Sequence, residues 1–319
     1  MIINTLTILF KKVQTYKSFV MEIKKYYGKV ILFGEYSMIF GSPALLMPLY
    51  SGSAHWDYIW RNHGKKNYSS NRSLHVFANY LSQNEYFTER IDIQKFNAEL
   101  KKGLFLDSCI PSGYGVGSSG ALTAAVYDRF KTYEIEDPME LKKFLGDMEN
   151  CFHGSSSGLD PLQCYYGKPF VLKDNQIEIL DKDFVPENLH IFLIDSNIKS
   201  DTKSLVTYFK CQRNEPRYLK AFDELYVPFV GRCIDSLVAG DADKFFDDLR
   251  HLSYYQTIML RPMITDNMLP LFSLKREDVH FQIKICGSGG GGYFLGFSDD
   301  VDKTNAFMAE NGFPITWII

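Results

Sequence analysis

The sequence predicts an α/β (α+β) protein with two domains, and three observations lead to that prediction. The chain has 319 residues, whereas a single domain usually takes about 150. Short apolar runs typical of buried strands occur in both halves of the chain, together with stretches of helical spacing. The composition also changes near residue 185, after a segment rich in Lys and Asp that ends at Pro186. We therefore expect one domain at 21–185 and a second at 186–319.

The composition excludes several classes of protein. Hydrophobic residues make up 45% of the chain and charged residues 23%, as in ordinary globular proteins. The formal charge of −3 argues against nucleic-acid binding, and 25 Phe with 20 Tyr argue against disorder. No apolar run approaches the roughly 18 residues that a membrane helix needs. The six cysteines are scattered without a CxxC pair, so we expect free thiols in a reducing cytoplasm.

The first twenty residues, MIINTLTILFKKVQTYKSFV, do not resemble a signal peptide, because a basic start and a cleavage site are missing. Met21 then opens a segment that runs directly into the first strand-like run. We expect residues 1–20 to be a mis-called or disordered extension, with Met21 as the true start.

In the first domain, Lys29–Phe33 is a short apolar run between Gly28 and Gly34, which predicts a buried strand. The polar stretch 61–73 predicts a surface loop. Asp137, Pro138 and Glu140 form a typical helix start. The helix that follows presents one apolar face, formed by Leu141, Phe144, Leu145, Met148 and Phe152.

In the second domain, the apolar run His190–Ile194 predicts another buried strand. Helical patterns follow at 216–238 and 241–260. Near the end, an alternating pattern predicts a half-buried strand at Phe281, Ile283 and Ile285.

A first chemical motif is the glycine loop within 110–130, where Gly113, Gly115 and Gly117 alternate with other residues before an apolar helix. Such a loop presents free N–H groups and the positive end of the helix dipole to an anion. The pattern is neither a Walker loop nor a dinucleotide-binding fingerprint. A glycine-rich turn capped by serine is the alternative.

A second motif is ENCFHGSSSGLDP at 149–161. Glu149 and Asp160 lie on either side of a Ser/Gly-rich turn. One carboxylate could hold Mg²⁺ while the other takes a proton from a substrate hydroxyl. The alternative is a solvated Glu at a helix end and an Asp in a turn.

A third motif is KICGSGGGGYFLGF at 284–297, in which four consecutive glycines separate two strand-like runs. A backbone that must approach a ligand or another chain segment explains them better than a loose hairpin does. Lys29, at the head of the first strand, either reaches solvent or projects over an anionic site.

Taken in this order, GKVILFGEYSMIFG, PSGYGVGSSGA and CGSGGGG resemble the three signature motifs of the GHMP kinases, across about residues 26–297. Within that superfamily the likeness is closest to the mevalonate kinases, because HGSSSGLD and DSNIKSDTKSLV (195–206) also resemble their segments. The resemblance implies an N-terminal ribosomal S5 domain 2-like domain, a C-terminal ferredoxin-like domain and a ligand cleft between them. It also implies ATP and Mg²⁺.

The resemblance assigns a role to each matching residue. Lys29 and Asp160 would be catalytic, and Ser119 and Glu149 would bind Mg²⁺. The acceptor would contact Glu35, Tyr36, His153, Ser157 and Gly158. From their order in the sequence, and not from the resemblance, Lys29 and Lys203 are the candidates for its carboxylate. ATP would be bound by Ser108, Gly113, Tyr114, Gly115, Val116, Gly117, Ser118, Ser119, Gly287, Gly289 and Gly290.

Several positions depart from the family pattern without removing a chemical group that phosphoryl transfer requires. They are Tyr36 for His, Gly120 for Ala, Ser156 for Pro, Pro161 for Asn and Cys286 for Thr. Tyr36 and Gly120 are nearer to the phosphomevalonate kinases, so they leave the acceptor open.

We expect an ATP-dependent kinase that converts mevalonate to 5-phosphomevalonate for isoprenoid synthesis. The alternatives are a phosphomevalonate kinase, another GHMP kinase acting on a sugar or homoserine, and a non-catalytic ATP-binding module. The expected partner is a small hydroxy acid, with no nucleic acid and no membrane. We expect a cytoplasmic location, and the sequence leaves open whether the chain forms a homodimer.

Overall fold

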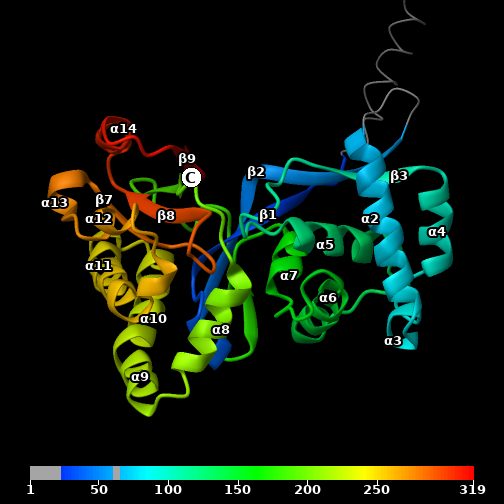
Figure 1. Ribbon diagram of the computed structural model, residues 1–319, viewed down its shortest axis with the longest axis horizontal. Helices are drawn as coiled ribbons and strands as arrows, with labels where there is room; N and C mark the ends of the chain where they lie inside the picture. The colour runs from blue at the N-terminus through cyan, green and yellow to red at the C-terminus, as the bar shows by residue number, and fades with distance from the viewer. Residues whose placement is uncertain (1–22, 60–64) are drawn as a thin grey trace, which may run out of the picture.

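The computed structural model describes residues 23–59 and 65–319, and its helices and strands form two sheets with helices packed against them (Figure 1). The expectation for residues 1–20 lies outside the described residues. The elements of the first half are β1 (Tyr26–Phe33), η1 (Ser37–Phe40), β2 (Ala44–Tyr58), α2 (Lys65–Ser82), α3 (Glu85–Thr88), α4 (Ile93–Lys101), β3 (Leu104–Ser108), α5 (Ser118–Phe130), α6 (Pro138–His153), α7 (Leu159–Tyr166), β4 (Phe170–Lys173) and β5 (Gln176–Ile179).

The elements of the second half begin after residue 189. They are β6 (His190–Asp195), α8 (Thr202–Gln212), α9 (Pro216–Ala221), η2 (Phe222–Tyr226), α10 (Val227–Val238), α11 (Ala242–Met259), η3 (Arg261–Met263), α12 (Leu269–Phe272), α13 (Arg276–Val279), β7 (Phe281–Ile285), β8 (Tyr293–Ser298), α14 (Val301–Glu310) and β9 (Ile315–Trp317). Within the described residues, no helix is both long and apolar enough to cross a membrane.

In the described part of the chain, β1, β2, β4 and β5 form one antiparallel sheet in that order, and β3 pairs with the far end of β2. The described strands of the second half form an antiparallel sheet in the order β7-β8-β6-β9. Helices α8 to α13 connect β6 to β7, and α14 connects β8 to β9. This is the βαββαβ order of a ferredoxin-like sheet, as the resemblance to the GHMP kinases implied.

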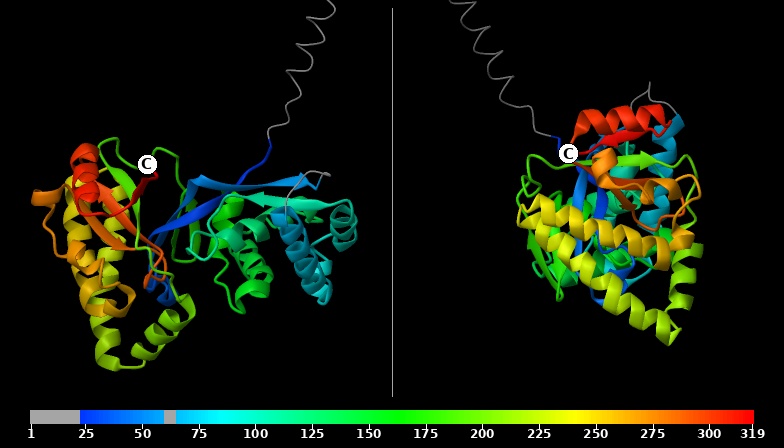
Figure 2. Two further views of the ribbon diagram at one scale, coloured as in Figure 1. Left: turned by 45° about the horizontal axis from the view of Figure 1, so that its top comes forward. Right: turned by 90° about the vertical axis from the view of Figure 1, so that its left-hand side faces the viewer.

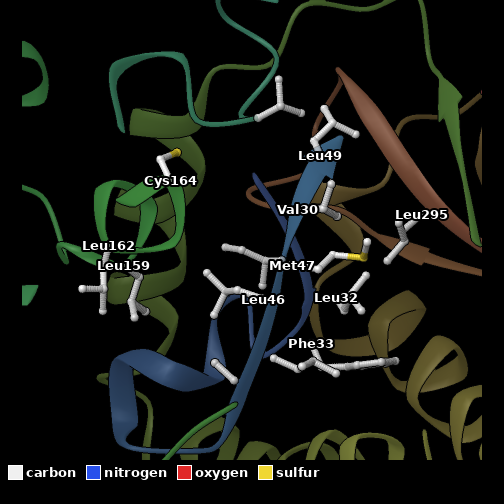
Figure 3. Close-up of a cluster of buried hydrophobic side chains, with 14 of the residues drawn as sticks. Val30, Leu32, Phe33, Leu46, Met47, Leu49, Leu159, Leu162, Cys164 and Leu295 are labelled. Carbon is white, nitrogen blue, oxygen red and sulfur yellow. The ribbon is translucent and has the colours of Figure 1, made fainter. Parts of the chain in front are cut away.

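The two halves share a hydrophobic core around β1 (Figure 3). Val30, Leu32 and Phe33 of β1 lie between α7 and the second sheet, with Leu159 on one side and Leu295 on the other. The Phe33 ring stacks on Phe297 at a centroid distance of 5.6 Å. Figure 2 shows β1 and β2 running between the two groups of helices. The strand that carries Lys29 is therefore held by both halves.

Most of the predicted elements are confirmed. The strand at 29–33 lies within β1, and 190–194 lies within β6. Asp137 caps α6 by accepting a hydrogen bond of 2.7 Å from the backbone N–H of Glu140, and Pro138 occupies the first turn. The helical pattern at 216–238 forms α9 and α10, joined by the π-helical turn η2.

Three predictions are corrected by the structure. The loop expected at 61–73 is wrong for 65–73, which belong to α2, while 61–64 lie outside the described residues. Polar side chains of α2 bond to β3: Ser70 Oγ donates to Leu106 O at 2.9 Å, which gives this polar helix a partner. The strand β7 is buried on both faces rather than half-buried. Phe152, expected in the core, is 37% exposed, although its ring lies 5.0 Å from that of Phe77.

Candidate active site

The glycine loop lies at the N-terminus of α5, where Gly117 precedes the first helical residue. Gly117 has φ +83°, and an added Cβ would lie 2.8 Å from Cγ of Lys29, so this position requires glycine. The backbone N–H of Lys29 donates to Val116 O at 2.9 Å, which ties the loop to β1. Free N–H groups at the start of a helix of this length can bind an anion such as a phosphate.

Lys29 and Asp160 form an ion pair beside this loop, with Lys29 Nζ 3.0 Å from Asp160 Oδ1. The Lys29 side chain is only 5% exposed, whereas that of Asp160 is 32% exposed. Burial lowers the pKa of Lys29, but the Asp160 charge and hydrogen bond outweigh it, so the pKa lies above its ordinary value. The Asp160 carboxylate is therefore accessible to a bound molecule, whereas the Lys29 side chain is buried. A carboxylate in this position can accept a proton from a bound hydroxyl.

Glu149, near the C-terminal end of α6, is buried and accepts hydrogen bonds from two serines. Ser119 Oγ donates to its Oε1 at 2.8 Å, and Ser156 Oγ donates to its Oε2 at 2.6 Å. These are hard oxygen donors, which suit Mg²⁺. The described residues contain no cluster of three or more His, Cys, Asp or Glu side chains that would bind a metal by itself. Mg²⁺ commonly uses one or two protein ligands together with phosphates, so the residues present fit this ion.

The helices α5 and α7 pack closely at Asp160, which lies in the first turn of α7. A Cβ added to Gly120 would lie 2.9 Å from the carbonyl carbon of Asp160 and 3.0 Å from N of Pro161. Gly120 and Pro161, two of the residues that differ from the GHMP kinase pattern, are therefore in direct contact. Cys164, also on α7, is buried, and its thiol contacts Gly117 O at 3.7 Å. Burial raises the pKa of this thiol, which keeps it protonated.

The loop 286–292 between β7 and β8 lies against the glycine loop of the first half. The rings of Tyr114 and Tyr293 are 5.0 Å apart. Gly290 N donates to Met263 O at 2.6 Å, and Gly292 N donates to Ile198 O at the same distance. A Cβ on Gly289 would lie 2.4 Å from Met263 O. The prediction that these glycines allow close approach to another segment is confirmed, and the loose-hairpin alternative is wrong.

The residues expected to contact the acceptor lie in different surroundings. Glu35 and Tyr36 are buried and already hydrogen-bonded across the two halves. Gly158 caps the start of α7, and Ser157 beside it is exposed. His153 ends α6, but its side chain is outside the part that the structure describes.

The other expected ligands flank the glycine loops. Ser108 ends β3, and its Oγ accepts a hydrogen bond of 3.2 Å from Ile110 N at the entrance to the first loop. Ser118 is the first residue of α5. Gly287 is the second residue after β7, near the start of the second loop. Lys203 is exposed in the first turn of α8.

The sequence argument missed two residues of the site. Ser156 was noted only as a replacement for proline, although its hydroxyl bonds to Glu149. Lys284 is fully buried in β7 and paired with Glu35. Its signal in the sequence is a lysine between two isoleucines, Ile283 and Ile285, shortly before the four glycines. Burial raises the pKa of Glu35, although the Lys284 ammonium opposes that shift.

Comparison with known proteins agrees with this geometry. Residues 78–168 match the family described as GHMP kinases N terminal domain. A mevalonate kinase from Thermococcus sibiricus is 25% identical over 325 aligned residues, covering 90% of this chain and 93% of that protein.

Solved structures extend the similarity to the whole described fold. The Methanococcus jannaschii mevalonate kinase has a TM-score of 0.64 at 18% identity, covering 93% of this chain and 97% of that one. The Streptococcus pneumoniae phosphomevalonate kinase, in complex with phosphomevalonate and AMPPNP, has a TM-score of 0.64 at 15% identity, covering 93% and 100%. The expected fold is therefore confirmed.

Proposed function

We propose that this chain is a phosphotransferase of the GHMP kinase family and that it transfers the γ-phosphoryl group of ATP to the 5-hydroxyl of mevalonate. The observation that carries the proposal is the Lys29–Asp160 pair, 3.0 Å apart, beside a glycine loop at the start of α5. It combines a candidate general base with an anion-binding loop. Phosphoryl transfer depends mainly on positioning and charge neutralisation, which is what this arrangement supplies.

In the proposed reaction, the N–H groups of the 113–119 loop bind the phosphates of ATP, and loop 286–292 closes against them. Asp160 orients the acceptor hydroxyl and takes its proton as the bond from that oxygen to the γ-phosphorus forms and ADP departs. Lys29 stays behind Asp160, where its ammonium stabilises the carboxylate and the phosphoryl oxygens. Ser119 and Glu149 would hold Mg²⁺, which neutralises charge on the transferred group.

We favour mevalonate over phosphomevalonate because the buried lysines of the site are already paired with carboxylates. A phosphorylated acceptor needs additional positive charge beside the cleft. Lys29 and Lys284 are buried, and each is already paired with a carboxylate. Lys203, exposed at the start of α8, is the candidate for the single carboxylate of mevalonate. The mevalonate kinase that is 25% identical to this chain supports the same choice.

The test is ADP release with Mg·ATP and, in turn, mevalonate, phosphomevalonate, galactose and homoserine. We expect saturable turnover with mevalonate, and we expect Asp160→Asn prepared in parallel to lack it, which excludes a contaminating kinase. Turnover only with phosphomevalonate or a sugar would retain the phosphotransfer chemistry and overturn the acceptor. ATP binding without turnover on any acceptor would support a binding module instead.

Two further parts of the proposal concern organisation and location. We place the domain boundary at 185/186, in the connection between β5 and β6. We propose a cytoplasmic location because the six cysteines are all free, and free thiols persist in a reducing compartment. A homodimer remains a prediction, which sedimentation velocity would test.

A further inference from the structure

The two residues after Gly34 make contacts that cross from β1 into the second half of the chain. Glu35 Oε1 pairs with Lys284 Nζ, and these side chains are 2% and 0% exposed. Tyr36 donates from its hydroxyl to Ser288 O at 2.7 Å. We call these two contacts the β1 anchor. Two consecutive residues thus contact both the end of β7 and the loop that follows it.

The anchor acts on a loop that is also held by hydrogen bonds within the second half. Ser200 Oγ donates to Gly289 O at 2.6 Å, and backbone bonds tie Gly290 and Gly292 to Met263 and Ile198. Those contacts give the loop its shape. The anchor instead relates the loop to β1, the strand that carries Lys29. Figure 2 shows the loop between β7 and β8 reaching the end of β1.

Glu35 and Tyr36 are both too buried to contact a bound small molecule. Tyr36 is 2% exposed, and its ring packs on Phe209 of α8 with centroids 4.6 Å apart. Lys284 Nζ also donates to Ile285 O at 2.6 Å, so its position is fixed from two sides. A buried ion pair contributes little to stability but requires a specific geometry. These properties suit a group that sets the position of another segment.

The anchor also lies beside the catalytic pair. Burial raises the pKa of the Glu35 carboxyl and of the Cys286 thiol, and in each case the Lys29 ammonium counteracts the shift. The charge of Lys29 therefore reaches both the anchor and the first residue of the loop. A displacement of the anchor would therefore move the end of β7 and the loop after it relative to the strand that carries Lys29.

We infer that Glu35 and Tyr36 are positioning residues, which fix loop 286–292 relative to Lys29, and that they are not ligands of the acceptor. This differs from the role that the family resemblance implied for them. The kinetic part of the test rests on the proposed function, whereas the exchange part does not.

The first variant is Tyr36→Phe, which removes the hydroxyl and keeps the ring against Phe209. Loss of one neutral hydrogen bond is expected to raise the KM for ATP about fivefold and to leave the KM for mevalonate unchanged. Tyr133→Phe, at a tyrosine that is 50% exposed, is the matched control and should change neither constant. A raised KM for mevalonate with an unchanged KM for ATP would overturn the inference, as would no change in either.

The second measurement is amide hydrogen exchange without any ligand. In Tyr36→Phe, loop 286–292 should exchange several-fold faster than in the parent protein, while the β4–β5 hairpin is unchanged. Because Lys284→Met alone strands a buried carboxylate, the ion pair is tested by Glu35→Gln combined with Lys284→Met, which should accelerate the same amides. Unaltered loop exchange in both variants would overturn the inference. If the parent protein phosphorylates no acceptor, the proposed function fails while the exchange result still decides the anchor.

Discussion

Gly120 offers the most direct test of how tightly the structure packs around Asp160. Alanine inside a helix is normally more favourable than glycine, by about 0.5–1 kcal/mol. At Gly120, however, the new Cβ would lie 2.9 Å from the backbone carbonyl carbon of Asp160. Carbon atoms prefer separations of about 3.5–4.0 Å, so α5 and the start of α7 must move apart by roughly 0.6 Å.

Overpacking of this kind usually costs about 1–3 kcal/mol. After the gain in helix propensity is subtracted, Gly120→Ala should lower the free energy of unfolding by about 1 kcal/mol. Because a 1 Å misplacement of a catalytic group can cost about a hundredfold in rate, the shift of Asp160 should lower kcat roughly tenfold. The assays are urea unfolding and ADP release.

The control is Gly231→Ala in α10, where an added Cβ would meet nothing within 4 Å. This variant should gain about 0.5–1 kcal/mol from propensity alone and retain full activity. If Gly120→Ala gained as much stability as Gly231→Ala and kept its kcat, the close packing on Asp160 and the reasoning from it would be refuted.

Three other predictions follow from the same geometry. Asp160→Asn should lower kcat by about 10²–10⁴ and leave the Kd for ATP, measured by calorimetry, nearly unchanged; an equal loss of ATP binding would argue against a role as base. Ser156→Ala should weaken Mn²⁺ binding in the nucleotide complex about tenfold, as seen by electron paramagnetic resonance, whereas Ser156→Thr should keep it; equal affinities in both would show that the bond to Glu149 is dispensable. Hydrogen bonds from Lys102 and Tyr58 lower the pKa of Glu99 from 4.5 to about 2, so its stabilising contribution is complete above pH 4.5 and is lost as the pH falls toward 2. Glu99→Gln should therefore lose less unfolding free energy than the parent protein between pH 5 and pH 3, and parallel pH profiles would contradict this.

Many of the helices and strands could be predicted from the sequence because they depend on residues that are close together in the chain. The start of α6 at Asp137 is one such case, since the cap and the helix are adjacent in the chain. The glycines at 289–292 correctly indicated close approach, although nothing in the sequence named Met263 as the segment approached.

The remainder depends on contacts between distant residues. The polar stretch 65–73 is helical because Ser70 and its neighbours find partners on β3, which begins more than thirty residues later. Lys284 and Glu35 are 249 residues apart, so no local pattern relates them. Motif resemblance assigned Glu35 to the acceptor, whereas the folded chain pairs it with Lys284 of β7.

The core around Phe33 determines how the two halves would behave if they were expressed as separate fragments. The buried residues of both halves form one continuous cluster, in which Phe33 packs between Phe297 and Phe245. Each half expressed alone would expose the apolar surface that the other half covers. Fragments 21–185 and 186–319 produced together should therefore reassociate, so the connection between β5 and β6 is a site for a split-protein reporter whose signal depends on reconstituting the phosphate-binding cleft.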